Sequence, residues 1–159
     1  MASNHVSYLD PIAVGAACPR KLNYMAKEEL FCTPLASRFF SAINVFPVKR
    51  DSADLSALKE AMRRVRRGEP LVLFPEGSRR FDGASNEPYP GIGFLAAKLN
   101  VPVIPAFIKG TEEALPCGAK FIRLTKISVC FGKQISIERR MPYQDIAGHI
   151  MDNIRHLSC

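Results

Sequence analysis

The sequence predicts an α/β fold, a single layered domain with a largely parallel central sheet flanked by helices. Short apolar runs alternate with helical patterns along the chain, which is typical of strands joined by crossover helices. The chain has 159 residues, 47% of them hydrophobic, enough for one domain with a sizeable buried core. Because no repeat, linker or low-complexity tract divides it, we expect residues 1–159 to form one domain.

Five short apolar runs predict the strands of this sheet. They are KLNYMA (21–26), NVFPV (44–48), PLVLF (70–74), VPVIPAFI (101–108) and KISVCFG (126–132). Ligands of such sheets bind at the carboxyl ends of the strands. We therefore expect the functional residues to follow these runs directly.

The clearest predicted helix spans residues 51–68. Basic residues crowd its last turn and Gly68 ends it, as is common at helix C-termini. Its apolar residues recur at intervals of three and four, which places them on one face of the helix. They are Leu55, Leu58, Met62 and Val65.

Further helices are predicted over residues 34–44, 91–100 and 141–157. The last of them carries an apolar stripe that is typical of a helix packed on a core. The stripe consists of Ile146, Ile150, Ile154 and Leu157.

The net charge and the cysteine content limit the kinds of partner and cellular compartment that we expect. A net charge of +7 and a pI near 9.4 favour an anionic partner, which is nucleic acid, a membrane surface or a phosphorylated small molecule. The five cysteines are scattered and include no CxxC pair, so they indicate neither a zinc site nor a disulfide framework. No apolar run approaches the roughly 20 residues of a membrane-spanning helix. We expect a cytoplasmic protein that meets any membrane from one side.

The segment NHVSYLD places His5 and Asp10 close together in the sequence. One interpretation makes Asp10 the N-cap of a helix that begins with Pro11. In the other, His5 lies in the turn leading into the helix and Asp10 near its first turn, since positions five apart on a regular helix point about 140° away from each other. The carboxylate would then accept the Nδ1–H of His5 and leave Nε2 as a base. The spacing by itself leaves both interpretations open.

The segment FPEGSRRF (74–81) follows a predicted strand. Its proline ends the strand because it has no N–H to donate, and Glu76, Gly77 and Ser78 then turn the chain. A turn does not require Glu76 and Arg79, which form either a solvated ion pair or a pair that holds a hydroxyl and a phosphate. Ser78 is not in a G-x-S-x-G elbow, so it is not expected to be a nucleophile.

Arg50 follows another predicted strand, 44–48. A lone arginine is most often surface charge. Beside Arg79 it would complete a two-arginine pocket suited to a phosphate dianion.

The segment PGIGFLAAKLNVPVIPAFIKG (90–110) predicts a helix followed by a strand. Its glycines and prolines either allow close packing of the helix and the strand, or they form one wall of a groove that binds an apolar chain. For Val103 and Ile104 we favour packing, and for Gly91 and Pro105 both interpretations stay open.

Taken in order, four blocks of the sequence resemble the glycerolipid acyltransferase family, most closely the lysophosphatidic acid acyltransferases (1-acyl-sn-glycerol-3-phosphate acyltransferases). The blocks are N-H-x-S-x-x-D, an arginine after a strand, F-P-E-G-x-R and V-P-V-I-P, at Asn4–Asp10, Phe46–Arg50, Phe74–Arg79 and Val101–Pro105. AKEEL at 26–30 and CFGKQI at 130–135 also resemble that family. The likeness therefore covers nearly the whole chain.

This resemblance implies transfer of a fatty acyl group from acyl-CoA or acyl-carrier protein to the hydroxyl of lysophosphatidic acid or a related lysophospholipid, in phospholipid biosynthesis. It implies that His5 is the base and that Asp10 orients it. The implied partners are the acyl donor, the lysophospholipid acceptor and an anionic membrane surface, with no nucleic acid, no metal and no cofactor beyond the donor substrate. The implied substrate-binding residues are Arg50, Glu76, Gly77, Ser78, Arg79 and Pro105.

The sequence departs from the family pattern in three places. Members usually carry a membrane-associated segment before the first block, whereas three residues precede Asn4 here. We therefore expect a domain that lacks this segment, either as a minimal version or as a fragment. Arg80 stands where a small hydroxyl residue is common, and residues 42–44 lack a common glycine; both bear on substrate preference.

A second class of function remains open, a catalytically weak lipid-binding protein of the membrane surface or a truncated fragment of the enzyme. A basic cluster on the helix 51–68 would suit anionic lipid, or it is a solvated helix end. The intact acid, base and arginine of the motifs favour the enzyme, which we expect to be peripheral on the inner face of a membrane. Nucleic-acid binding is the third class of function and is less favoured, because the sequence contains no recognition motif for it. The cluster consists of Arg63, Arg64, Arg66 and Arg67.

Overall fold

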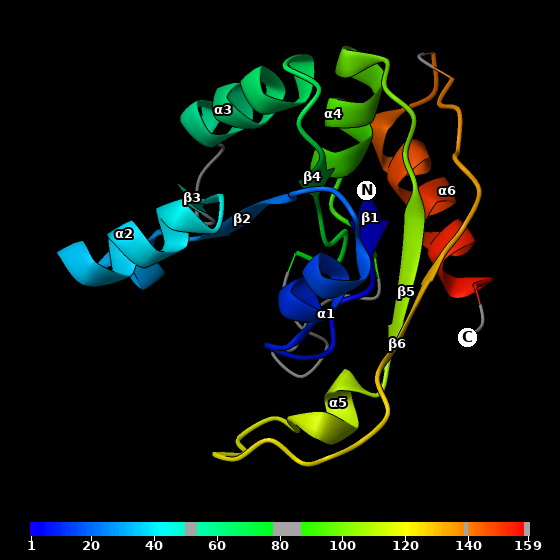
Figure 1. The fold of residues 1–159 in the computed structure, drawn as a ribbon. Coiled ribbons are helices and arrows are strands. Elements are labelled where there is room, and N and C mark those ends of the chain that lie inside the picture. Colours follow the sequence, from blue (N-terminus) through cyan, green and yellow to red (C-terminus); the bar gives the residue numbers. More distant parts are fainter. Residues whose placement is uncertain (50–53, 78–86, 139, 158–159) are drawn as a thin grey trace. The chain divides into compact units, whose positions relative to one another are not determined.

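The chain falls into two compact units in the computed structural model (Figure 1). The first unit comprises Met1–Pro19 and Phe74–Cys159, and the second comprises Arg20–Leu73. Both contain parallel strands and helices, which confirms the predicted α/β class. The described residues are 1–49, 54–77, 87–138 and 140–157.

The sheet of the first unit has the strand order β1-β5-β6. The strands are β1 (Ala2–Ser3), β5 (Pro105–Lys109) and β6 (Ser128–Phe131). β1 runs parallel to β5, with Ala2 opposite Pro105, and β6 runs antiparallel to β5. The polar residues after β1 therefore emerge at the same edge as the end of β5.

β5 begins at Pro105, four residues later than the predicted start. Val103 instead makes an isolated antiparallel bridge with Ile135. Each of these two residues donates its N–H to the carbonyl of the other, over 3.1 and 2.7 Å. The packing interpretation of Val103 agrees with its burial.

Helices flank this sheet. They are α1 (Asp10–Ala17), α4 (Gly91–Leu99), α5 (Thr111–Ala114) and α6 (Tyr143–Arg155). α1 contacts β5 and β6, α6 contacts β5 and β1, and Figure 1 shows α1 and α6 on either side of β5. The predicted stripe of α6 is confirmed, since Ile146, Ile150 and Ile154 are completely or almost completely buried.

The second unit has its own sheet, of order β3-β2-β4. The strands are β2 (Asn23–Lys27), β3 (Val45–Val48) and β4 (Leu71–Val72), all paired in parallel. Its helices are the 3-10 helix η1 (Glu28–Phe31), α2 (Pro34–Ala42) and α3 (Leu55–Arg66). Every parallel pairing needs a crossover, which here passes through a helix of the kind the sequence pattern predicted.

α3 begins four residues later than predicted and is capped by Asp54, which accepts hydrogen bonds from the N–H groups of Ser56 and Ala57. The four apolar residues of the predicted face are not the most buried residues of this helix. Ala57 and Ala61 are buried, whereas Leu55 is exposed and the other three apolar residues of that face are half-buried. Alanine allows the closest approach of a helix, so the larger side chains lie at the margins of the contact.

Part of the basic cluster on α3 has a structural role. Arg64 lies over the ring of Phe46, 4.7 Å from its centroid, and donates to the side chains of Asn23 and Glu60. Arg63 also donates to Glu60. The hydrogen bonds from Arg63 and then Arg64 lower the pKa of Glu60 from 4.5 to about 2. Two of the four arginines thus interact with their own unit.

Cys18, Cys32 and Cys117 are free thiols, whereas Cys130 is disulfide-bonded, which the scattered spacing did not predict. Of the helices in the described part of the chain, none is both long and apolar enough to cross a membrane.

Candidate active site

The site begins where the chain leaves β1. The side chain of Asn4 takes the place of a backbone peptide group beside β5, donating Nδ2–H to the Ile108 carbonyl at 2.9 Å and accepting the Ile108 N–H at 2.8 Å. Because the backbone groups of Ile108 stay satisfied, the main chain can turn away at His5 while β5 continues. Sequence reasoning assigned no role to Asn4, although it is the first residue of the first block.

His5 and Asp10 meet across this turn. The Nδ1 of His5 lies 2.7 Å from Oδ2 of Asp10. Since a carboxylate accepts and does not donate, Nδ1 carries a proton, and in the neutral imidazole Nε2 is the nitrogen with the free lone pair. The His5 side chain is 13% exposed and that of Asp10 is fully buried. The contact required by the functional interpretation of the spacing is therefore present.

The N-cap interpretation of Asp10 was wrong. Asp10 is the first residue of α1, the N-cap position belongs to Leu9, and no side chain caps this helix end. The carboxylate points back to the preceding turn, where its Oδ2 accepts the N–H groups of Val6 at 2.6 Å and Ser7 at 2.7 Å. Two backbone donors and the imidazole thus converge on one oxygen.

Thr111 completes the surroundings of the carboxylate. Its hydroxyl donates to Oδ1 of Asp10 at 2.6 Å, so all four partners of this buried group are donors. Such hydrogen bonds offset the cost of burying a charge. Sequence reasoning missed Thr111, but it comes two residues after β5 ends, and the rule that sites follow strand ends could have found it.

The turn is also tied to the segment after α5. The hydroxyl of Ser7 donates to the carbonyl of Leu115 at 3.2 Å and accepts the N–H of Leu9 at 3.3 Å. His5 is therefore held by contacts well beyond its neighbours in the sequence.

Phe74 covers the imidazole. The two rings are stacked, with centroids 4.2 Å apart and an interplanar angle of 21°. The aromatic ring excludes water from one face of His5 and limits its rotation. Phe74 is the first residue of F-P-E-G, so the structure brings the first and third sequence blocks together.

Beyond Phe74 the chain forms a tight turn. Gly77 donates its N–H to the carbonyl of Phe74 at 3.0 Å, and its φ of +67° is in the region that favours glycine. A Cβ at Gly77 would lie 2.5 Å from two ring carbons of Tyr89. Glu76 is 5% exposed, so this turn holds an acid in the interior, two residues from the ring that contacts His5.

The other predicted site residues are placed as follows. Pro105 is buried opposite Ala2, at the start of β5, whereas His5 follows the end of β1. Pro105 is thus at the other end of the strand pair, and its predicted binding role stays a prediction. Arg50, Ser78 and Arg79 lie outside the described residues. In the described part, no group of three or more His, Cys, Asp or Glu side chains is arranged to hold a metal ion.

This arrangement suits proton transfer. A histidine whose Nδ1–H is held by a buried carboxylate can accept a proton at Nε2, and the carboxylate then stabilises the imidazolium. The contacts with Asp10 and Phe74 restrict the ring, and Nε2 is the ring nitrogen that is not bonded to Asp10.

The sequence of this chain is similar to those of known proteins. The family model described as Acyltransferase matches residues 1–109. The 1-acyl-sn-glycerol-3-phosphate acyltransferase BAT2 (chloroplastic) of Brassica napus is 33% identical over 122 residues, covering 76% of this chain and 35% of that protein. The 1-acyl-sn-glycerol-3-phosphate acyltransferase of Bacillus subtilis is 27% identical over 139 residues, covering 85% of this chain and 65% of that one.

The fold is similar to that of a solved structure as well. The crystal structure of the 1-acyl-sn-glycerophosphate (LPA) acyltransferase PlsC from Thermotoga maritima matches with a TM-score of 0.75 and 24% identity, covering 97% of this chain and 62% of that chain. The chain thus spans between about a third and two thirds of the length of these proteins. By its sequence over residues 1–109, with the fold in agreement, this chain belongs to the Acyltransferase family.

Proposed function

We propose that this chain transfers a fatty acyl group from acyl-CoA or acyl-carrier protein to the free hydroxyl of lysophosphatidic acid or a related lysophospholipid. The observation that carries the proposal is the His5–Asp10 pair, with Nδ1 on a buried carboxylate and Nε2 left as a base. The names of the curated relatives, all 1-acyl-sn-glycerol-3-phosphate acyltransferases, support the choice of substrates.

In the proposed mechanism, Nε2 of His5 takes the proton of the acceptor hydroxyl as its oxygen attacks the thioester carbonyl. A C–O bond forms, the C–S bond breaks, and the imidazolium returns the proton to the departing thiolate. Asp10 keeps the tautomer and stabilises the positive charge between these steps. A positioned base of this kind contributes about 10²- to 10⁴-fold to the rate.

The proposal assigns the remaining predicted residues to binding. Glu76 and Gly77, with Arg50, Ser78 and Arg79, would hold the glycerol phosphate, and Pro105 would help shape the acyl site. We also propose that residues 1–159 act as one acyltransferase domain, peripheral on the anionic inner face of a membrane.

The test compares acyl transfer from a long-chain acyl-CoA to lysophosphatidic acid in the intact chain, His5→Ala and His149→Ala. His149 is an exposed histidine on α6, so it is the matched control. We expect His5→Ala to lose activity by at least about 100-fold and His149→Ala to keep it, with cooperative unfolding in all three. Full activity of folded His5→Ala would exclude His5 as the base.

A second candidate, lipid binding without catalysis, has one observation in its favour. A hollow of about 400 Å³ on α3 is lined by five residues, most of them basic. No turnover by any of the three folded proteins would favour this candidate. The lining residues are Lys59, Met62, Arg63, Arg66 and Arg67.

A further inference from the structure

A long exposed loop follows α5. We call residues Lys120–Ile127 (KFIRLTKI) the exposed loop, because all eight are exposed. It includes four large apolar side chains: Phe121 is 83% exposed, Ile122 is 64% exposed, Leu124 is fully exposed and Ile127 is 40% exposed. Single exposed apolar residues are ordinary, but a contiguous group of this kind often marks a surface that binds a partner or a membrane.

Cations alternate with these apolar residues. Lys120, Arg123 and Lys126 lie in the same loop, and their side chains form no ion pair with any carboxylate that the structure describes. The nearest acids in the sequence are on α5, where Glu112 accepts the N–H of Gly110. The loop therefore presents positive charge and apolar surface together.

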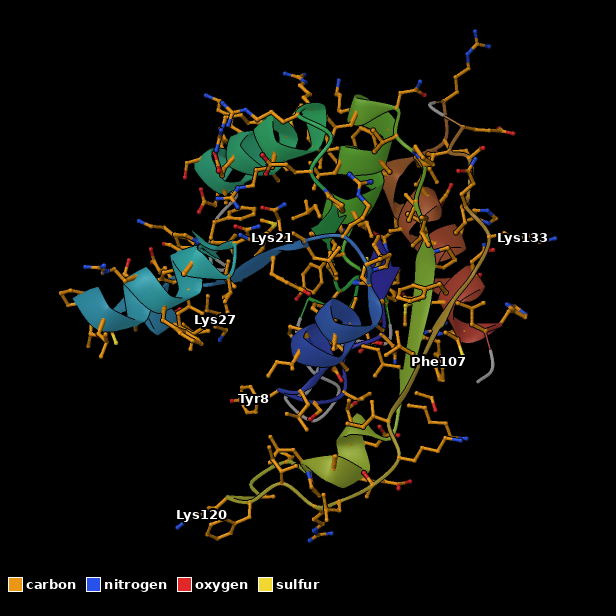
Figure 2. The ribbon with its side chains drawn as sticks, in the orientation of Figure 1. Tyr8, Lys21, Lys27, Phe107, Lys120 and Lys133 are labelled. Carbon is orange, nitrogen blue, oxygen red and sulfur yellow. The ribbon has the colours of Figure 1, made fainter. Side chains whose placement is uncertain are left out.

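The loop is anchored through its middle and its C-terminal part. The N–H of Arg123 donates to the Ala114 carbonyl at 2.7 Å, and the hydroxyl of Thr125 donates to the Gly110 carbonyl at 3.3 Å. Gly110, with φ of +91°, approaches Lys126 so closely that a Cβ would overlap the backbone oxygen of that residue. Figure 2 shows Lys120 at the far end of the loop, beyond α5. The apolar side chains are thus held away from the core.

The same anchor belongs to the candidate active site. Thr111, in the helix directly before the loop, donates to Asp10, and the Leu115 carbonyl accepts the hydroxyl of Ser7. A surface that binds the loop would therefore lie near the turn that carries His5.

We infer that the exposed loop docks the protein on a bilayer that contains anionic phospholipid. Phe121, Ile122 and Leu124 enter the interface between headgroups and acyl chains, while the three cations stay among the headgroups. This inference deepens the membrane attachment proposed above by naming the surface that makes it, and delivery of a lipid acceptor to His5 rests on the proposed function. An acidic protein partner is less favoured, because a stable protein interface buries about 800 Å² on each side with complementary shape, and eight residues of irregular loop offer little of either.

The experiment is co-sedimentation of the full chain with vesicles of phosphatidylcholine, with and without phosphatidylglycerol. We expect binding that requires phosphatidylglycerol and weakens with salt. Leu124→Glu should lower the partition coefficient at least about tenfold, since it replaces an inserting side chain by an anion. Because Leu124 is fully exposed, the substitution leaves the fold intact.

The matched control is Leu35→Glu, on α2, where Leu35 is 80% exposed. Loss of binding in Leu35→Glu with full binding in Leu124→Glu would overturn the inference and assign docking to α2. Equal vesicle binding by Leu124→Glu and the unchanged chain would overturn it too. So would a Leu124→Glu variant that keeps vesicle binding but loses binding to acyl-carrier protein, because the loop would then bind a protein.

A turnover assay separates this inference from the proposed function. With a water-soluble short-chain lysophosphatidic acid, Leu124→Glu should match the unchanged chain, whereas with acceptor in anionic vesicles it should be slower. If the unchanged chain binds vesicles through the loop but shows no turnover, docking stands and acyl transfer fails. If it turns over the soluble acceptor but does not bind vesicles, acyl transfer stands and docking fails.

Discussion

Replacing Asp10 by asparagine separates the charge of this residue from its hydrogen bonds. Its Oδ2 receives three donors, from His5, Val6 and Ser7, whereas its Oδ1 receives only the hydroxyl of Thr111. The amide oxygen of an asparagine must therefore take the Oδ2 position, because an NH₂ group there would face two backbone N–H groups. The NH₂ group then faces Thr111, whose hydroxyl can turn and accept.

The magnitudes follow from this geometry. Asp10→Asn keeps the donors paired, so we expect it to lower the free energy of unfolding by only about 1 kcal/mol. Asp10→Ala leaves the N–H groups of Val6 and Ser7 and the Thr111 hydroxyl without this acceptor. At about 1–3 kcal/mol each we expect a loss of about 3–9 kcal/mol. For catalysis, an imidazolium and a carboxylate about 4 Å apart attract by about 4 kcal/mol at an effective dielectric constant of 20. Losing this attraction should slow turnover by about 10²- to 10³-fold.

The assays are urea unfolding and acyl transfer on the unchanged chain, Asp10→Asn and Asp10→Ala. If Asp10→Asn is as unstable as Asp10→Ala, the deduced amide orientation is wrong. If folded Asp10→Asn turns over at the unchanged rate, the charge of Asp10 does not stabilise an imidazolium and the base mechanism fails.

Two further predictions concern stability. Gly77→Ala should lower the free energy of unfolding by about 1–2 kcal/mol, because the φ of Gly77 is +67°. The control in the same urea titration is Gly118→Ala, since Gly118 has a φ of +78° and a Cβ there would have no atom within 4 Å. A smaller loss of stability at Gly77 than at Gly118 would contradict the close contact with Tyr89. Glu60→Gln should cost about 0.5–1 kcal/mol at pH 7. Because the pKa of Glu60 is lowered from 4.5 to about 2, this stabilisation is present above pH 4.5 and is lost as the pH falls toward 2. If the melting temperatures of the unchanged chain and Glu60→Gln differ by the same amount from pH 7 to pH 2, the ion-pair assignment is wrong.

Much of the fold was predictable because its signals are local. The alternation of apolar runs and helical patterns predicted the order of most strands and the larger helices, and the stripe of α6 is buried as expected. Elements with little local signal were missed. β1 has two residues and α5 has four, and such short elements exist because of the partners they contact rather than their own propensity.

The candidate site divides in the same way. The residue types and spacing of NHVSYLD and FPEG are local, and they were enough to name His5, Asp10 and Glu76 and to suggest proton-transfer chemistry. The choice between a helix cap and a partner for His5 was not local, because both interpretations use the same residue in the same place. The structure decided it by the direction in which the carboxylate points.

The sequence by itself therefore determined the α/β class, the family blocks and the candidate residues His5 and Asp10, because each depends on residues a few positions apart. Tertiary structure alone decided what surrounds that pair. Thr111 and Asp10 are 101 positions apart, and Asn4 and Ile108 are 104 apart. These contacts exist because β1 pairs with β5, and no pattern within either segment states that pairing. The same pairing brings Thr111 and Leu115, which precede the exposed loop in the sequence, into contact with the turn of His5.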